Sequence, residues 1–411
     1  MRQMSTVIIG AGQAGLAMSK CLTDRSVPHV VIERGDVANS WATERWDSLK
    51  LLTPNWQSRL PGYRYGGGAP DGYMSMPEIN GYLQGYACSI AAPVEARTTV
   101  QSVTVQGFGY RVSTDRGDWL CDNLVLATGA CGQAHVPALS EELPDHIAQL
   151  TPHTYKTPDQ IGPGGVLVVG GSASGTQIAA ELLGAGHEVT LSVGAHIRAP
   201  RHYRSRDIQW WMDRSGVQDT HIEELDDPQR ARSVPSLQLV GDANPPFLDL
   251  NYLQGLGAEL TGRLVGFRNG VAQFSGSLAN QCALSDLKMR RLLKSFDDWA
   301  ERQGLQGLPA APDHGSTEPP PNPRLSLDLK AGGIRTVIWA TGYRPDFGFA
   351  KLPIFDHKGG LRHLNGVVGP GIYVLGLPFQ IRRKSALIDG VGQDAEELAN
   401  HLLQCRHNKA A

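Results

Sequence analysis

Two short glycine-rich segments of the chain have the residue spacing that binds the pyrophosphate of a dinucleotide. The first, residues 10–15, reads Gly-Ala-Gly-Gln-Ala-Gly and lies between a β-branched run and a segment with helical spacing. The first glycine of such a motif permits a tight turn, the second lets the backbone approach a pyrophosphate, and the third allows close packing of helix on strand. Free N–H groups at the start of the helix bind the anion. The segment therefore predicts a dinucleotide site.

A carboxylate follows the next apolar run of the same unit. Glu33 comes directly after His29-Val30-Val31-Ile32, about twenty residues beyond the turn, where an acid accepts hydrogen bonds from ribose hydroxyls. The same carboxylate repels a ribose 2′-phosphate. We therefore expect FAD or NAD here rather than NADP; the alternative is a glycine-rich turn without function.

The second segment, residues 170–175, reads Gly-Gly-Ser-Ala-Ser-Gly and follows the apolar run Val166–Val169. Ser172 replaces the middle glycine and is still small enough for a diphosphate to approach. The next strand, 189–193, does not end in an acidic residue, and Arg198 and Arg201 follow it. A guanidinium can donate two parallel hydrogen bonds to a phosphate group. These arginines therefore indicate a binding site for a ribose 2′-phosphate and favour NADPH over NADH. The alternative for both arginines is a solvated basic loop.

The surrounding segments predict a duplicated strand–turn–helix–strand unit, at residues 5–34 and 166–193. Strands at 124–129 and 336–342 each end in Ala-Thr-Gly, and the Pro-rich segments 135–165 and 305–324 interrupt the pattern. Residues 278–303 have the spacing of an amphipathic helix, with Leu284, Leu287, Leu292 and Phe296 on one side.

Composition excludes several other classes of protein. The 411 residues carry a net charge of −2, which argues against nucleic acid as a partner because a binding surface for it is basic. The six cysteines form no C-x-x-C pair, and no histidines stand at metal-ligand spacing, so we expect neither a redox dithiol nor a metal. No apolar run has the length of a membrane span, and we expect a cytoplasmic protein without a membrane partner.

Two nucleotide sites in one chain suggest hydride transfer from a nicotinamide to a flavin, a redox step that side chains cannot perform themselves. With its two motifs, Trp41, the segment 46–49 and the run Ala340-Thr341-Gly342-Tyr343, the sequence resembles the class B flavoprotein monooxygenases, which include the flavin-containing monooxygenases. Within this group it is similar to bacterial putative FAD/NAD(P)-binding oxidoreductases. The resemblance covers most of the chain except roughly residues 196–330.

The resemblance implies an α/β fold with two Rossmann-like, three-layer dinucleotide-binding domains, the NADPH domain being inserted in the FAD domain. We expect the FAD domain at residues 1–155 and 325–411, and the NADPH domain with a variable insert at 156–324. FAD and NADPH are the expected cofactors. The expected cofactor-binding residues are Gly10, Gly12, Gln13, Ala14, Gly15, Glu33, Arg34, Trp41, Thr128, Gly129, Gly170, Ser172, Ser174, Gly175, Arg198, Arg201, Thr341, Gly342 and Gly392. Gly392 is expected to meet the flavin ring near a helix N-terminus.

Two positions depart from the family pattern. Thr151 stands where the family fingerprint has a histidine, and Leu52 where flavin-containing monooxygenases have an asparagine. Neither change touches cofactor binding, but both bear on oxygen transfer. No side-chain acid or base is assigned.

The sequence thus predicts an NADPH-dependent FAD monooxygenase that transfers one oxygen atom from O2 to a small organic substrate by N-, S- or C-oxygenation. An NADPH oxidase or electron-transfer reductase without an oxygenated product stays open. A non-catalytic flavin-bound sensor or assembly protein is the alternative from another class, and a homodimer is also left open.

Overall fold

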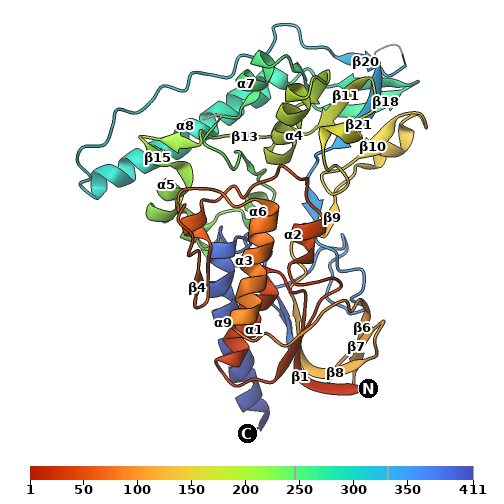
Figure 1. Cartoon of the computed structure of the whole chain (residues 1–411), viewed down its shortest axis with the longest axis vertical. Helices are drawn as coiled ribbons and strands as arrows, with labels where there is room; N and C mark the ends of the chain where they lie inside the picture. The colour runs from red at the N-terminus through yellow and green to blue at the C-terminus, as the bar shows by residue number, and fades with distance from the viewer. Residues whose placement is uncertain (245–246, 331–332, 411) are drawn as a thin grey trace.

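The computed structural model describes residues 1–244, 247–330 and 333–410. The chain forms two lobes, each built on its own sheet, and the first strand β1 and the last helix α9 lie together in one of them (Figure 1). We call this lobe the terminal lobe and the other the inserted lobe.

The terminal lobe is centred on a mixed sheet with the strand order β23-β24-β8-β1-β2-β5, which the hairpin β6–β7 joins through β8. Strands β24, β8, β1, β2 and β5 are parallel. The bounds are β1 Arg2–Ile9, β2 His29–Ile32, β5 Val94–Glu95, β6 Val100–Gln106, β7 Gly109–Thr114, β8 Trp119–Leu126, β23 Val367–Gly369 and β24 Ile372–Val374.

Both faces of this sheet are covered, which explains the continuous apolar run Val7-Ile8-Ile9. Helices α1 (Gln13–Thr23), α3 (Met76–Ser89) and α9 (Ile388–Ala410) share one core with the sheet. The opposite face packs against the β6–β7 hairpin and residues 347–355.

The inserted lobe contains a parallel sheet with the order β10-β21-β11-β12-β17. Helices α4 and α7 and the start of α8 cover one face, and the antiparallel strands β18-β19-β20 cover the other. The bounds are β10 Ala148–Leu150, β11 Gly165–Val169, α4 Ala173–Gly184, β12 Val189–Ser192, α7 Leu250–Gly255, β17 Glu259–Thr261, β18 Leu264–Arg268, β19 Val271–Phe274, α8 Leu278–Arg302, β20 Ser326–Asp328 and β21 Ile334–Trp339.

A two-stranded ribbon of β9 (Gln133–Ala134) and β22 (Tyr343–Arg344) joins the lobes. The expected domain boundaries at 155/156 and 324/325 do not coincide with the limits of the two sheets. Strand β10 precedes residue 155, and β20 and β21 follow residue 325, but all three strands lie in the inserted lobe. The first Pro-rich segment, 135–165, therefore begins at a crossing, directly after β9, whereas the second, 305–324, lies within the inserted lobe. We propose that the inserted domain runs from the end of β9 to the start of β22.

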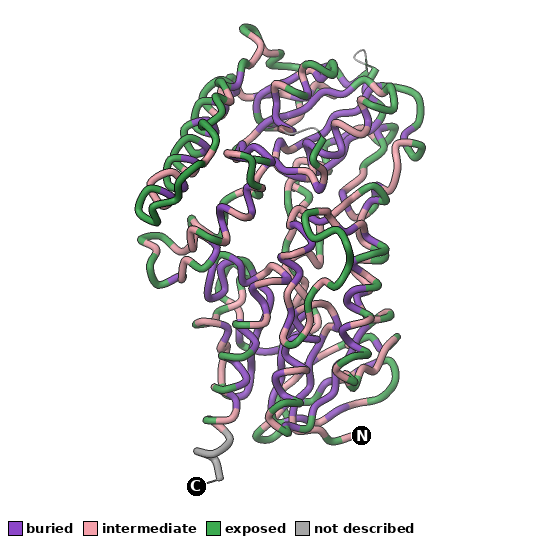
Figure 2. The backbone as a smooth tube through the Cα atoms, turned by 60° about the vertical axis from the view of Figure 1, so that its left-hand side comes forward, coloured by how far each residue is buried: buried purple, intermediate pink, exposed green. Residues whose placement is uncertain are grey.

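The predicted helix at 278–303 is confirmed as α8, and its predicted apolar face is right at Phe296 and Leu292, which pack in the core, but wrong at Leu284 and Leu287. Leu284 and Leu287 are 50% and 41% exposed, whereas Cys282, Met289 and Phe296 are buried. The buried side of α8 packs against Ala199, Tyr203 and Trp211 of the preceding segment, so tertiary contacts select the face. Figure 2 shows the exposed outer side of this long helix.

The shorter elements connect these units. They are α2 Asn39–Thr43, β3 Arg59–Leu60, β4 Tyr63–Arg64, β13 Ile197–Arg198, β14 His202–Tyr203, β15 Arg206–Asp207, α5 Ile208–Arg214, α6 Pro228–Arg232, β16 Leu237–Gln238 and the 3-10 turns at 55–57, 138–142, 158–160, 217–219 and 222–224.

Glycine allows each nucleotide-motif helix to lie close on its strand. A Cβ on Gly175 of α4 would lie 1.8 Å from the carbonyl oxygen of Gly170, and a Cβ on Gly15 of α1 would lie at the same distance from that of Gly10. Real atoms do not approach so closely, so a side chain at either position forces helix and strand apart.

We predict that Gly175→Ala lowers the free energy of unfolding by about 1–3 kcal/mol, the usual cost of overpacking. Gly184→Ala in the same helix is the matched control, because nothing lies within 4 Å of a Cβ there. Since alanine is the better helix former, the control should be neutral or stabilising. Apparent melting temperatures measure both; equal shifts would contradict the packing argument.

Candidate functional site

The first glycine turn joins β1 to α1 and faces the end of β8. Gly10 has a φ of 108°, and a Cβ there would lie 2.6 Å from the carbonyl oxygen of Ala127. Gly12 has nothing within 4 Å of its Cβ position and begins α1 without a side-chain cap. The N–H groups of the first helical turn are therefore available to a ligand anion.

Glu33 is fixed beside this turn by the backbone. Its carboxylate accepts hydrogen bonds from Ala11 N–H at 2.7 Å and Gly35 N–H at 3.2 Å. The side chain is buried and stands at the carboxyl end of β2. Its remaining acceptor capacity suits the hydroxyls of a ribose.

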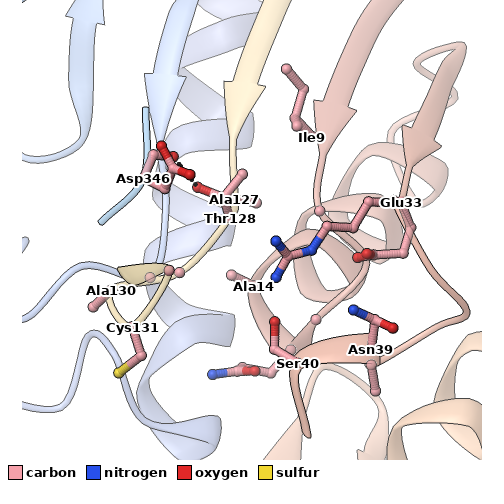
Figure 3. A pocket seen from close by; sticks show the side chains of 18 of the residues that line it. Ile9, Ala14, Glu33, Asn39, Ser40, Ala127, Thr128, Ala130, Cys131 and Asp346 are labelled. Atoms are coloured by element: carbon pink, nitrogen blue, oxygen red, sulfur yellow. Dashed lines mark hydrogen bonds between the residues drawn. The ribbon is translucent and has the colours of Figure 1, made fainter. Parts of the chain in front are cut away.

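A cavity of about 360 Å³ lies at this end of the sheet. Figure 3 shows Glu33 on one side of it, with Thr128 and Asp346 on the other. Expected FAD-binding residues that line it are Gly10, Gly12, Gln13, Ala14, Glu33, Arg34, Trp41, Thr128 and Gly129. The remaining expected residue of the turn, Gly15, packs behind it on Gly10.

The second turn repeats this geometry in the inserted lobe. Gly170 has a φ of 120°, and its Cβ position lies 2.3 Å from the carbonyl oxygen of Ala340. Ser172 begins α4 without a side-chain cap, so the N–H groups of this helix are also available. Each turn thus faces an Ala-Thr-Gly strand end, whose glycine, Gly129 or Gly342, has a positive φ.

Four ring-bearing or charged side chains lie where the lobes meet. The Arg45 guanidinium is 5.4 Å from the Trp41 ring and 6.0 Å from the Tyr343 ring, and His153 stacks 5.0 Å from Tyr343. Burial, with the charge of Arg45, lowers the pKa of His153, so its imidazole is neutral at pH 7. Burial raises the pKa of Tyr343, and the nearby charge of Arg45 opposes this shift.

The prediction that Arg198 binds a 2′-phosphate is wrong. Its guanidinium is buried in ion pairs with Asp249 at 2.6 Å and Asp286 at 3.0 Å, and it also donates to two carbonyl oxygens, of His314 and Gly315. These bonds fasten α7 and α8 to the linker after α8. A guanidinium with these partners has no free pair of N–H donors for a ligand phosphate.

Arg201 is likewise buried and paired. It contacts Asp207 at 2.6 Å and donates to the carbonyl oxygens of Leu52 and Val240. The predicted 2′-phosphate role is wrong for this residue too, because its bonds hold the two lobes together.

Gly392 does not line the cavity, contrary to expectation. It lies against Pro61, whose ring would be 2.9–3.0 Å from a Cβ added at this position, whereas Ala386, just before α9, lines the cavity. Sequence reasoning also missed Thr98, Cys131 and Gly376 as lining residues. Only topology brings these three together, since each follows a different strand of the sheet.

Other kinds of site find no support in the described ranges. No cluster of His, Cys, Asp and Glu there is arranged to hold a metal ion. Nor does any helix in that part of the chain combine the length and hydrophobicity needed to cross a membrane. The six cysteines are free thiols.

Two dinucleotide-binding lobes joined by one crossing ribbon define a flavin- and nicotinamide-linked class of oxidoreductase. A family model described as pyridine nucleotide-disulphide oxidoreductase matches residues 7–215. The chain belongs to this family, which implies FAD and NADPH as cofactors. The two uncapped helix starts fit two pyrophosphates.

Relatives and solved structures agree with this membership. The chain is 31% identical over 404 residues to an uncharacterized oxidoreductase CzcO-like from Geobacillus kaustophilus, covering 97% of this chain and 98% of that protein. It is 32% identical over 193 residues to the indole-3-pyruvate monooxygenase YUCCA1 of Oryza sativa, covering 46% and 47%. The flavin-containing monooxygenase from Stenotrophomonas maltophilia has the same fold, with 21% identity, a TM-score of 0.68 and coverage of 98% and 99%.

We predict that Glu33→Ala weakens FAD binding about 10–100-fold, because it removes charge-assisted hydrogen bonds to the ribose. Asp36→Ala is the matched control: this acid follows in the same loop, pairs with Arg97 on the surface and is 63% exposed. Fluorescence titration of the apoprotein with FAD measures both.

Glu33→Gln separates the ribose contact from the fold, since the amide oxygen still accepts from Ala11 N–H. Glu33→Gln should therefore also bind FAD more weakly than the wild type, at an unchanged melting temperature. Wild-type affinity in both Glu33 variants would remove the carboxylate from the FAD site.

Proposed function

We propose that the protein is an NADPH-dependent FAD monooxygenase. Substrate, O2, NADPH and a proton would give the singly oxygenated substrate, NADP⁺ and water, with a nitrogen, sulfur or carbon centre as the site of oxygenation. The observation that carries the proposal is the pair of uncapped helix starts, one per lobe, on either side of the Trp41–Arg45–Tyr343 contact.

The bound flavin supplies the redox chemistry, accepting hydride and activating oxygen. The chain's residues position the partners. Trp41 donates from its indole N–H to Gln13 at 3.1 Å, which fixes its ring beside the first turn. Lys156 donates to the carbonyl oxygens of Thr43 and Arg45, at 2.6 and 2.7 Å, and so holds the Trp41 segment against the inserted lobe.

The names of similar proteins support oxygenation. The rice relative is a monooxygenase of indole-3-pyruvate, and the Stenotrophomonas maltophilia protein is a flavin-containing monooxygenase. We take from them the reaction class, transfer of one oxygen atom, and leave the substrate to experiment.

A second candidate is an NADPH oxidase or electron-transfer reductase. Leu52 offers no side-chain amide, and its carbonyl oxygen is bonded to Arg201. Thr151 bonds through its N–H to the Thr154 hydroxyl at 2.9 Å, within its own turn. Leu52 thus has no polar side chain, and Thr151 has a hydroxyl in place of an imidazole. The absence of the amide and the imidazole of the oxygenating relatives favours release of reduced oxygen without a product.

We predict that NADPH consumption by the holoenzyme is matched by oxygenated product when a suitable amine, thioether or ketone is supplied. Product by mass spectrometry, peroxide and NADPH absorbance are measured together. Peroxide should fall as product rises, because both draw on the same reduced flavin.

Stoichiometric peroxide with every candidate substrate would overturn the oxygenase and establish the oxidase. Rapid NADPH oxidation only with an added electron acceptor would establish the reductase. No NADPH oxidation at all would leave a flavin-bound sensor or assembly protein.

A further inference from the structure

The two glycine turns correspond residue by residue, and they differ at the position directly after the second strand, where an acid can accept hydrogen bonds from a ribose. Gly10 N–H bonds Ile32 at the end of β2, and Gly170 N–H bonds Ser192 at the end of β12. The next residue is Glu33 in the first turn and Val193 in the second.

Val193 leaves the second turn without a carboxylate. A Cβ on Gly171 would lie 3.2 Å from the Val193 side chain, so this valine packs where Glu33 accepts its hydrogen bond from Ala11. The second turn therefore has neither the acceptor for ribose hydroxyls nor the negative charge that repels a 2′-phosphate.

The strand beside β12 brings an arginine to the same edge. Thr261, the last residue of β17, is opposite Ser192 in the parallel register, and Arg263 follows two residues later. The Ser192 hydroxyl donates to Gly262 O at 3.0 Å and accepts from Leu264 N–H at 2.8 Å. This one side chain thus holds the backbone on both sides of Arg263.

The Arg263 side chain lies along the strand end. Its Cγ and Cδ are 3.9 Å from the Cβ position of Gly194, so the arginine stem passes beside the residue that follows Val193. Arg263 is exposed, and within the described residues it has no acidic partner.

The terminal lobe has an arginine at the matching position, but that arginine is paired with an acid. Arg97 follows Glu95 of β5 by two residues, as Arg263 follows Thr261, and it is paired with Asp36 at 3.0 Å. Counting from the strand ends, the counterpart of Asp36 is His196, which is buried and whose pKa is lowered by burial. The inserted lobe thus has the arginine, but a histidine replaces the acid that pairs with it in the terminal lobe.

We infer that Arg263 binds the 2′-phosphate of NADPH and sets the preference of this protein for NADPH over NADH. A free guanidinium beside a strand end without a carboxylate offers the forked donors that a phosphate accepts. Arg263 thereby takes the role that the sequence assigned to Arg198 and Arg201. The inference rests on the proposed function in one respect, the placing of the nicotinamide nucleotide at the second turn.

The test is binding to the FAD-loaded protein by isothermal titration, with adenosine 2′,5′-bisphosphate and 5′-AMP as probes. Arg263→Ala should weaken binding of the bisphosphate about 10–100-fold, the effect expected from the loss of one charge-assisted hydrogen bond. The affinity for 5′-AMP should not change. Arg263→Lys should restore part of the affinity, since it keeps the charge without the fork.

Arg268→Ala is the matched control, an exposed arginine at the far end of β18. It should bind both probes like the wild type, and all variants should keep their FAD and melting temperature. Equal bisphosphate affinity in Arg263→Ala and wild type would overturn the assignment of Arg263 alone. Failure of the wild type to bind either probe would instead overturn the nucleotide site of the proposed function.

Discussion

The close approach of backbone to backbone at the two glycine turns is the constraint on which the structure depends. Gly10 and Gly170 each lie against the carbonyl oxygen of an alanine that ends a crossing strand, at a distance no side chain would permit. This contact fixes the start of α1 and of α4 relative to the two strands that connect the lobes. The amides proposed to bind pyrophosphate are thus positioned by the same packing that joins the domains.

Duplication of this arrangement explains the organisation of the site. Both crossings occur next to an Ala-Thr-Gly strand end, and β9 pairs with β22 there. Both turns therefore lie near the same junction, where Arg45 lies between the ring of Trp41 in the terminal lobe and that of Tyr343 in the joining ribbon. The lobes differ beside the two turns, because Glu33 lies next to the first turn, whereas Val193 and the unpaired Arg263 lie next to the second among the described residues.

The sequence predicted the α/β fold and both strand–turn–helix units, since glycine spacing and β-branched runs are local signals. It did not predict the partners of charged residues, because these come from distant segments. Arg198 meets Asp249 and Asp286 only after α7 and α8 pack beside it. Arg263 was missed for the same reason, as its place beside β12 follows from the pairing of β17. The binding roles of the turn residues stay predictions.

Flavin reduction tests the central claim most directly, because it needs both turns at once. The purified protein should be yellow with bound FAD, and anaerobic addition of NADPH should bleach the flavin absorbance within the dead time or seconds of mixing. A correctly folded chain that stays colourless after incubation with FAD, or a bound flavin that NADPH never reduces, would contradict the account.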